Sequence, residues 1–313
     1  MSTALVLIAL AVCIGLSAPA VLQRASWSKR SPRLGIAAWQ ASVFAVLSSG
    51  VLLAVTAILP VRHVSFDLGH VLHACPDPAH PAQLLDDAPL HLLSLAMAVA
   101  TLLVLGRALY GCCRSVRRGR QRQRQLLDLL VRQRDELHGA HVLEHDVPLA
   151  YCVPGAGGGQ IVVTTAALAS LDERELTAVL AHEHAHLDGR HDLILLGADV
   201  AARAFPWLPL ARTARRELAL LVEMLADDEG ARRTDRDTLA RALIDLGQAA
   251  VPVGAVAANG DTVERVHRLL AGLAAPGRLA RCALAVGTTA LLISPWLVAL
   301  LPPWAAHSGL CSR

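Results

Sequence analysis

The stretch from Thr177 to His186 reads Thr-Ala-Val-Leu-Ala-His-Glu-His-Ala-His and holds the most concentrated chemistry of the chain. Ser170, followed by Glu173 three residues later, matches a capping box, which predicts that a helix begins there. Apolar residues then recur at helical spacing: Leu176, Val179 and Leu180. Gly189 can end such a helix. We therefore predict one helix that carries the histidine-rich segment in its last turns.

The spacing of these histidines is that of a metal site. His182 and His186 are four residues apart, so both imidazole rings project from one helix face and can reach one metal ion at about 2.0–2.1 Å. Glu183 lies on the adjoining face, where its carboxylate can hold the attacking water and accept its proton. His184 points to the other side and is assigned no metal role. A His-rich surface helix could carry the same pattern by chance, but a capped helix after a strand, with a buried apolar side, favours zinc.

Upstream of this helix the sequence predicts a small β-sheet. Val147–Val153 and Gln160–Thr165 are expected as strands, because the second contains the β-branched run Ile161–Thr165. The glycine-rich segment Gly155–Gly159 lies between them. It lacks the Gly-Lys-Ser/Thr ending of a phosphate-binding loop, so we interpret it as a hairpin turn.

A catalytic zinc site usually has three protein ligands and one open position, so a third ligand is needed downstream. The candidates are His191, Glu217, Glu223, Asp227, Asp228 and Glu229. Residues 212–233 predict a helix, and Glu223 and Asp227 share one of its faces. An acid beside a ligating Glu can hydrogen-bond a ligating histidine and fix its tautomer. The apolar segment Leu193–Leu210 is interrupted by charges and prolines, so we interpret it as a buried or interfacial helix.

On either side of this block the chain is apolar enough for a membrane. The hydrophobic fraction is 54%, and the mean hydropathy is +0.45. Apolar runs at 4–22, 34–59, 90–105 and 283–301 come near the roughly 20 residues that span a bilayer. Ala18-Pro19-Ala20 resembles a signal-peptide cleavage site, but no basic residue precedes the first run, which favours an uncleaved span.

The charges between the runs follow the positive-inside rule. The loop 23–33 and the segment 111–124 are basic and lack acids, whereas the loop 60–89 carries Arg62 against Asp67, Asp77, Asp86 and Asp87. Arg278 and Arg281 precede the fourth run. We predict a multi-pass cell-membrane protein with its N-terminus outside, residues 1–110 as a membrane region, residues 111–280 as a cytoplasmic domain, and the tail 302–313 outside. The arginine run at 114–124 has no interleaved aromatic residues, so we expect contact with membrane lipid and no direct nucleic-acid binding.

The cysteines and the outer loop give two further hypotheses. The seven cysteines form no C-x-x-C pair, which argues against a cysteine-only zinc site. Under the predicted topology Cys75 and Cys311 alone lie outside the membrane on the oxidising side, so we expect a disulfide between them. Histidines and an aspartate of the loop 60–89 could form a metal sensor, but their irregular spacing favours a solvated polar loop.

The residues 177–186, with Asp192 following, resemble the membrane zinc peptidases of the BlaR/MecR type, the beta-lactam sensor–transducer peptidases. They resemble more distantly the CAAX-prenyl-protease and HtpX-type membrane peptidases. Both groups carry H-E-x-x-H followed by a helix with E-x-x-x-D, which is Glu223-Met224-Leu225-Ala226-Asp227 in this chain. The resemblance is specific from about residue 145 to 245. It implies a mainly α fold with a small β-sheet, in which a gluzincin-like α+β peptidase domain lies between spans 3 and 4 of a four-helix transmembrane anchor.

The resemblance also implies roles for individual residues. One zinc ion per chain would be bound by His182, His186 and Glu223, with Glu183 as the general base and Asp227 behind the ligands. A substrate peptide would add as a strand beside the segment Gln160, Ile161, Val162, Val163 and Thr164. The sensor–transducers carry a penicillin-binding domain after the last span. Only residues 302–313 follow here, so we expect the peptidase module alone.

Two functions remain open from the sequence. The first is a zinc endopeptidase that cleaves a cytoplasmic or membrane-proximal protein, with a transcriptional repressor as a candidate substrate by resemblance. The second is a non-catalytic membrane signal transducer with a structural zinc site. The intact Glu183 favours the enzyme, since a structural site needs no general base.

Overall fold

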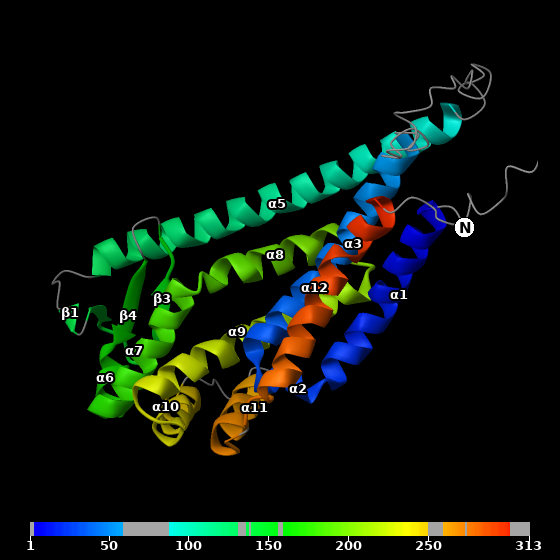
Figure 1. Ribbon diagram of the computed structural model, residues 1–313. Coiled ribbons are helices and arrows are strands. Elements are labelled where there is room, and N and C mark those ends of the chain that lie inside the picture. Colours follow the sequence, from blue (N-terminus) through cyan, green and yellow to red (C-terminus); the bar gives the residue numbers. More distant parts are fainter. Residues whose placement is uncertain are drawn as a thin grey trace, which may run out of the picture.

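The computed structural model describes residues 3–58, 88–130, 136–137, 139–155, 159–249, 259–272 and 274–300. Four helices among these residues are long and apolar enough to cross a membrane, as the sequence predicts. They are α1 (Thr3–Arg24), α3 (Pro32–Ile58), α5 (Ala88–Leu130) and α12 (Arg278–Leu300). In Figure 1, α1 and α12 run beside α3, whereas α5 departs from one end of α3 and runs over α8.

The third span is part of a much longer helix than predicted. The helix α5 has 43 residues, and its apolar window covers Val99–Gly119 rather than residues 90–105. The sequence also favours a helix that leaves the membrane over residues 115–138, and α5 is helical without a break from the apolar window to Leu130. The arginine-rich stretch is therefore helical and continuous with the span.

A four-stranded sheet follows α5, in the order β1-β2-β4-β3. The strands are β1 (Glu136–Leu137), β2 (Ala140–Leu143), β3 (Ala150–Val153) and β4 (Gln160–Thr164). The strand β4 pairs in parallel with β2 and antiparallel with β3, so both of its edges are occupied. The expectation that a substrate adds beside Gln160–Thr164 is therefore wrong. The open edge on this side of the sheet belongs to β3.

Six helices lie between the sheet and α12 in the described part of the chain. They are α6 (Thr165–Ser170), α7 (Glu173–Asp188), α8 (His191–Ala204), α9 (Pro209–Arg233), α10 (Arg236–Ala249) and α11 (Asn259–Leu270). The capping box of α7 is formed by Asp172 and Glu175 rather than by Ser170 and Glu173. The reason is that Ser170 ends the short helix α6, and its hydroxyl donates back to the Ala167 carbonyl. Gly189 caps α7 as predicted.

The helix α9 joins the helices that follow the sheet to the apolar helices α1 and α3. Its first half packs with α1 and α3 in one hydrophobic cluster, which contains Trp39, Leu210 and Leu221. Gln23, at the end of α1, donates a hydrogen bond of 3.0 Å to Glu217 of α9. The spans and the segment 111–280 therefore share a core, although the sequence suggests two separate regions.

The apolar segment Leu193–Leu210 consists of α8, a break at residues 205–208, and the start of α9. It is absent from the four helices that could span a membrane. Cys75 and Cys311 lie outside the described residues, so their disulfide stays a prediction.

Candidate metal centre

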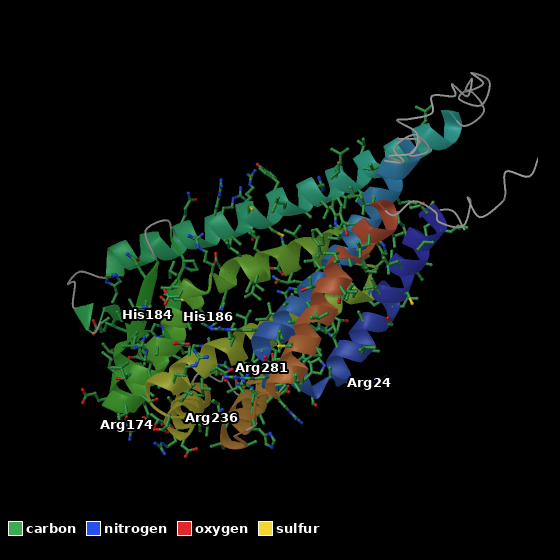
Figure 2. The ribbon with its side chains drawn as sticks, viewed as in Figure 1. Arg24, Arg174, His184, His186, Arg236 and Arg281 are labelled. Carbon is green, nitrogen blue, oxygen red and sulfur yellow. The ribbon has the colours of Figure 1, made fainter. Side chains whose placement is uncertain are left out.

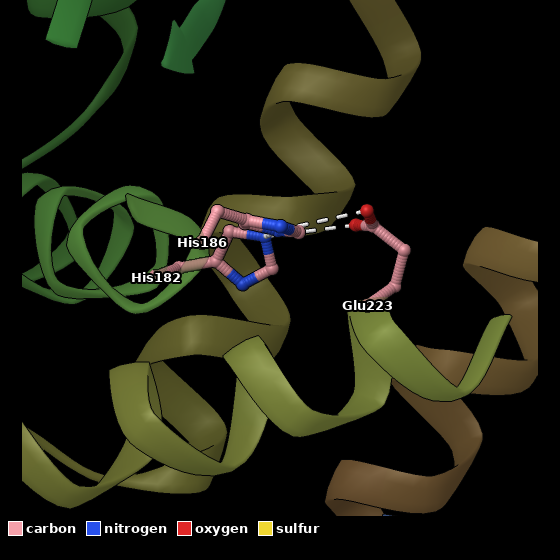
Figure 3. A group of neighbouring side chains, drawn as sticks. All are labelled: His182, His186 and Glu223. Atoms are coloured by element: carbon pink, nitrogen blue, oxygen red, sulfur yellow. Dashed lines mark hydrogen bonds and ion pairs between the residues drawn. The ribbon is translucent and has the colours of Figure 1, made fainter. Parts of the chain in front are cut away.

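Two helices bring three metal-ligating side chains together. His182 and His186 project from one face of α7, and Glu223 of α9 faces them (Figure 3). The two histidine Nε2 atoms lie 3.1 Å apart. Glu223 Oε2 lies 3.6 Å from His182 Nε2, and Glu223 Oε1 lies 3.6 Å from His186 Nε2. The three side chains that the resemblance implies as zinc ligands therefore converge in the structure.

These separations suit one zinc ion. Tetrahedral ligands at about 2.0–2.1 Å from zinc lie about 3.3 Å from one another, close to the 3.1 and 3.6 Å between these atoms. The donor set, two imidazoles and one carboxylate, is also that of catalytic zinc sites with one open position. The residues present therefore fit the metal that the sequence pattern implies.

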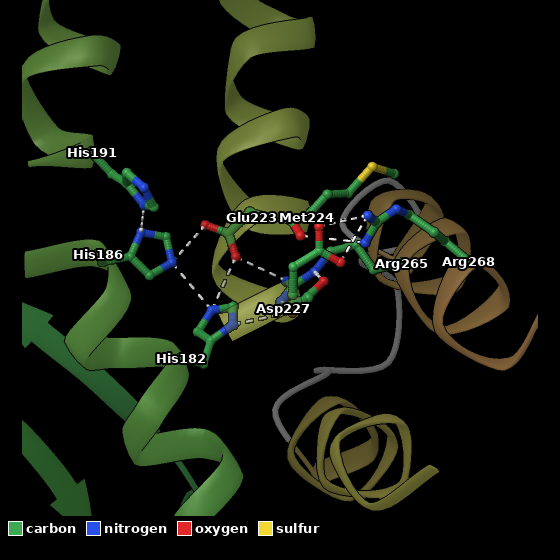
Figure 4. Close-up of polar contacts among 9 residues, drawn as sticks. His182, His186, His191, Glu223, Met224, Asp227, Arg265 and Arg268 are labelled. Atoms are coloured by element: carbon green, nitrogen blue, oxygen red, sulfur yellow. Dashed lines mark hydrogen bonds and ion pairs between the residues drawn. The ribbon is translucent and has the colours of Figure 1, made fainter. Parts of the chain in front are cut away.

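In each of the two histidines, the Nδ1 atom contacts a neighbouring side chain on the side away from Glu223 (Figure 4). His182 Nδ1 lies 3.1 Å from Asp227 Oδ1, and Asp227 is completely buried. His186 Nδ1 lies 3.1 Å from His191 Nδ1. Such contacts fix the ring orientation and leave both Nε2 atoms free for a metal.

The local backbone explains how His191 reaches this position. Gly189 and Arg190 connect α7 to α8, and Arg190 adopts the left-handed conformation with φ 45°. A Cβ atom on Gly189 would lie 2.4 Å from His191 Nε2, so only glycine leaves room for the imidazole. The sequence offers Gly189 as a helix end and His191 as a candidate ligand. In the structure both serve the orientation of His186.

Two arginines of α11 lie behind the acids of the site, and the sequence does not predict them. Arg265 of α11 donates to both oxygens of Asp227, at 2.8 and 2.6 Å, and its Nη1 lies 3.0 Å from Glu223 Oε2. Arg268, one turn later, binds both oxygens of Asp228 at 2.8 and 2.9 Å. Nothing in the sequence of α11 distinguishes these arginines from a solvated basic face, because their partners lie about 40 residues earlier on another helix.

The carboxylates and the arginine set the charge states of the metal-free site. Burial alone lowers the pKa of His182, but Asp227 and Glu223 outweigh it and raise that pKa to about 9. For His186, burial prevails and lowers the pKa to about 4. Burial raises the pKa of Glu223, yet hydrogen bonding to His182 and the charge of Arg265 hold it at about 2. At neutral pH the metal-free site therefore holds one protonated histidine and one neutral histidine.

Glu183 lies between the metal-ligating side chains and the open edge of the sheet. Burial raises the pKa of its carboxyl, while the His182 charge and hydrogen bonds from the thiol and backbone of Cys152 lower it, with a net rise. Burial and the neighbouring Glu183 raise the pKa of the Cys152 thiol to about 12, so it stays protonated. A raised pKa suits a carboxylate that must accept a proton near neutral pH.

Other candidates from the sequence lie away from this centre. His184 is exposed and, together with His191, lines a cavity of about 900 Å³ beside α7. Glu217 binds Gln23, Asp228 binds Arg268, and Glu229 pairs with Arg232. Glu223 is therefore the one downstream acid that faces both histidines within the described part of the chain.

Replacing Arg265 tests whether its contacts with Asp227 stabilise the site. Arg265→Ala should lower the free energy of unfolding by about 3–5 kcal/mol, because it leaves the fully buried Asp227 charge with half of its partners removed. The measurement is the unfolding midpoint of the full chain in nonionic detergent. The control is Arg174→Ala, which breaks the exposed pair with Asp235 and should cost at most about 1 kcal/mol. Equal midpoints for the two variants would contradict the role of Arg265.

Residues 117–217 match the model of peptidase family M48. The match covers less than half of the chain, and it shows that this region is similar to the M48 metallopeptidases in the broad sense. It covers the sheet and the whole of α7, and it ends before Glu223. Comparison with curated proteins finds no match for the chain. The M48 match, the four apolar helices and the His-His-Glu cluster together support a membrane metallopeptidase.

Proposed function

We propose that this chain is a membrane-anchored, zinc-dependent endopeptidase whose centre is formed by His182, His186 and Glu223. The observation that carries the proposal is the convergence of their three donor atoms at 3.1–3.6 Å, with Glu183 beside them. Zinc bound there would act as a Lewis acid on a scissile carbonyl and lower the pKa of a water molecule.

The chain's own residues would carry the proton. Glu183 accepts a proton from the attacking water as the C–O bond forms, and then delivers it to the leaving amine as the C–N bond breaks. Its raised pKa favours both transfers. Asp227 and His191 hold the two imidazoles in place during these steps, since each contacts the nitrogen that faces away from the centre.

The open edge of β3 is the proposed substrate site. The Thr164 amide donates to the Leu149 carbonyl at 2.9 Å, so residues 149, 151 and 153 direct their backbone toward β4. Ala150 and Cys152 then direct theirs outward. A peptide that adds to this edge runs past Glu183, because the Cys152 backbone already donates to that carboxylate.

A second candidate is a non-catalytic signal transducer with a structural zinc. Structural zinc sites are usually closed by four protein ligands, whereas three donors converge here among the described residues. The half-buried Glu183 also has no task in a structural site. Both features favour the enzyme.

The substrate class follows from the resemblance and from the placement of the site. We propose a cytoplasmic or membrane-proximal protein, with a transcriptional repressor as the candidate partner by resemblance to BlaR/MecR-type peptidases. Cleavage of such a partner would make the chain part of a signalling pathway.

We also propose that the centre lies on the cytoplasmic side of the cell membrane, with both termini outside. The support is the arginine-rich segment after Val104 and the basic residues at the start of α12. A cytoplasmic-active reporter inserted near residue 260 should be active, and an export-dependent reporter at the same position should be silent. The reverse pair of results would invert the proposed topology.

Metal removal tests the proposed function directly. A zinc chelator should abolish cleavage of an unfolded model substrate, and added zinc should restore it. The apparent zinc affinity should rise about tenfold per pH unit between pH 7 and about 9, because zinc must displace the proton that His182 carries below its metal-free pKa. Glu223 and His186 release no proton in that range, since their pKa values lie near 2 and 4.

The affinity is measured by competition with a chromogenic zinc chelator over that pH range. Cleavage that continues at full rate in a zinc-free, chelator-treated sample would reject the metallopeptidase. A flat affinity profile would reject the assigned charge state of His182 while leaving the function intact.

A further inference from the structure

A second cavity of about 240 Å³ lies away from the metal centre and is lined mainly by arginines. Its lining residues are Arg30, Asp228, Ala231, Arg232, Arg236, Arg268 and Ala275. They come from five separate parts of the chain: α2 (Ser26–Arg30), α9, α10, α11, and the segment just before α12. Convergence of guanidinium groups from distant segments indicates a built site rather than one basic helix face.

The charges of this cavity are only partly balanced. Arg268 binds Asp228 through two contacts of 2.8 and 2.9 Å, and Arg232 pairs with Glu229. Arg30 and Arg236 form no ion pair within the described part of the chain. The cavity therefore holds a surplus of two positive charges, and two guanidinium groups are available for an outside anion.

The cavity lies near one set of ends of the apolar helices α1, α3 and α12. Arg30 belongs to the short connection between α1 and α3, and Ala275 closely precedes α12. Figure 2 shows Arg236 at the same end of the molecule as Arg24, the last residue of α1, and Arg281, in the first turn of α12. An anion at the membrane surface on this side would meet the cavity opening.

We propose that this cavity binds a phosphate-bearing anion, either the headgroup of an anionic phospholipid or free phosphate. Guanidinium groups bind phosphate oxygens in a bidentate manner, and basic pockets beside membrane helices bind acidic headgroups. A phosphate group that accepts hydrogen bonds from Arg30 and Arg236 would neutralise the positive charge that Asp228 and Glu229 leave uncompensated.

Such a ligand would join the elements that surround it. Arg268 already donates to the Lys29 carbonyl at 2.7 Å and to the Met224 carbonyl at 3.3 Å, so it ties α2 to α9. Lys29 also pairs with Glu264 of α11. An anion between Arg30 and Arg236 adds a contact of the same kind, so binding should raise the unfolding temperature.

The experiment uses the full chain in nonionic detergent with three probes: dioctanoyl phosphatidylglycerol, dioctanoyl phosphatidylcholine and inorganic phosphate. Native mass spectrometry counts bound lipid, and thermal unfolding reports binding of all three. The double variant Arg30→Gln/Arg236→Gln should weaken anion binding by about tenfold or more, because each charge-assisted contact is worth that much. The control Arg117→Gln/Arg118→Gln removes the same charge from the exposed arginine run of α5, which does not line this cavity, and should weaken anion binding clearly less than the cavity variant does.

Comparing phosphatidylglycerol with inorganic phosphate also distinguishes the two sources of the phosphate group. Stabilisation by phosphatidylglycerol but not by inorganic phosphate assigns the cavity to a lipid, and equal stabilisation by both assigns it to the free anion. Binding that is as strong for phosphatidylcholine as for phosphatidylglycerol would overturn the proposal. So would binding that the Arg30/Arg236 variant and the Arg117/Arg118 variant reduce to the same extent.

Discussion

Glu183→Gln should reduce cleavage by about 10²–10⁴-fold while the zinc content and the unfolding temperature stay close to those of the wild type. The amide can still hydrogen-bond water, but it cannot accept the water's proton. Glu183 is also not among the three donors that converge on the proposed metal position, so its replacement should leave the zinc in place. Zinc content and cleavage of a co-expressed partner should be measured on the same preparation.

The same variant separates the two functions that the sequence leaves open. A transducer with a structural zinc would keep its biological effect when Glu183 is replaced, whereas a peptidase would lose it. Glu173→Gln, at the start of the same helix, is the matched control and should change neither the zinc content nor the cleavage. Wild-type cleavage by the Glu183 variant would remove this residue from the mechanism.

Glu223→Ala should release zinc on mild dialysis, and this is the second large effect that we expect. Without the carboxylate the site keeps two imidazoles, which cannot supply the three protein ligands of a catalytic zinc. Asp227→Asn should weaken zinc binding by only about 10–100-fold, because Asp227 contacts His182 Nδ1 rather than the metal position. Asparagine keeps a similar shape, so the effect of an empty space beside Arg265 is avoided.

Glu229→Ala is the control on the same helix. Glu229 pairs with Arg232 and does not face the histidines, so this variant should hold zinc as the wild type does. If Asp227→Asn lost zinc as completely as Glu223→Ala, the two acids would have exchanged roles, and the helix register behind the assignment would be wrong.

Local spacing predicts which side chains of the centre share a helix face, and the resemblance to the peptidase families implies that the two faces meet. The i, i+4 rule puts His182 and His186 on one face and Glu223 and Asp227 on another, whatever the rest of the fold does. The four apolar helices are likewise a local property of composition. The prediction of Ser170 as the cap is wrong, since Ser170 is the last residue of the short helix α6.

Long-range pairing accounts for most of what the sequence does not provide. The assignment of Gln160–Thr164 as the substrate edge fails because β2, which the sequence does not predict, pairs with β4 from the other side. The same holds for Arg265, whose partners Asp227 and Glu223 lie on another helix. The partners of such residues can be identified only from the packed structure, because they lie far apart in the sequence.

The central claim is that one zinc ion sits among His182, His186 and Glu223. X-ray absorption spectroscopy of the purified, zinc-loaded chain tests it most directly. The account predicts one zinc per chain, with a first shell made only of nitrogen and oxygen at about 2.0–2.1 Å that disappears in the Glu223→Ala variant. A shell that contains sulfur at about 2.3 Å, the distance for a thiolate such as that of Cys152, or a shell unchanged by Glu223→Ala, would contradict it.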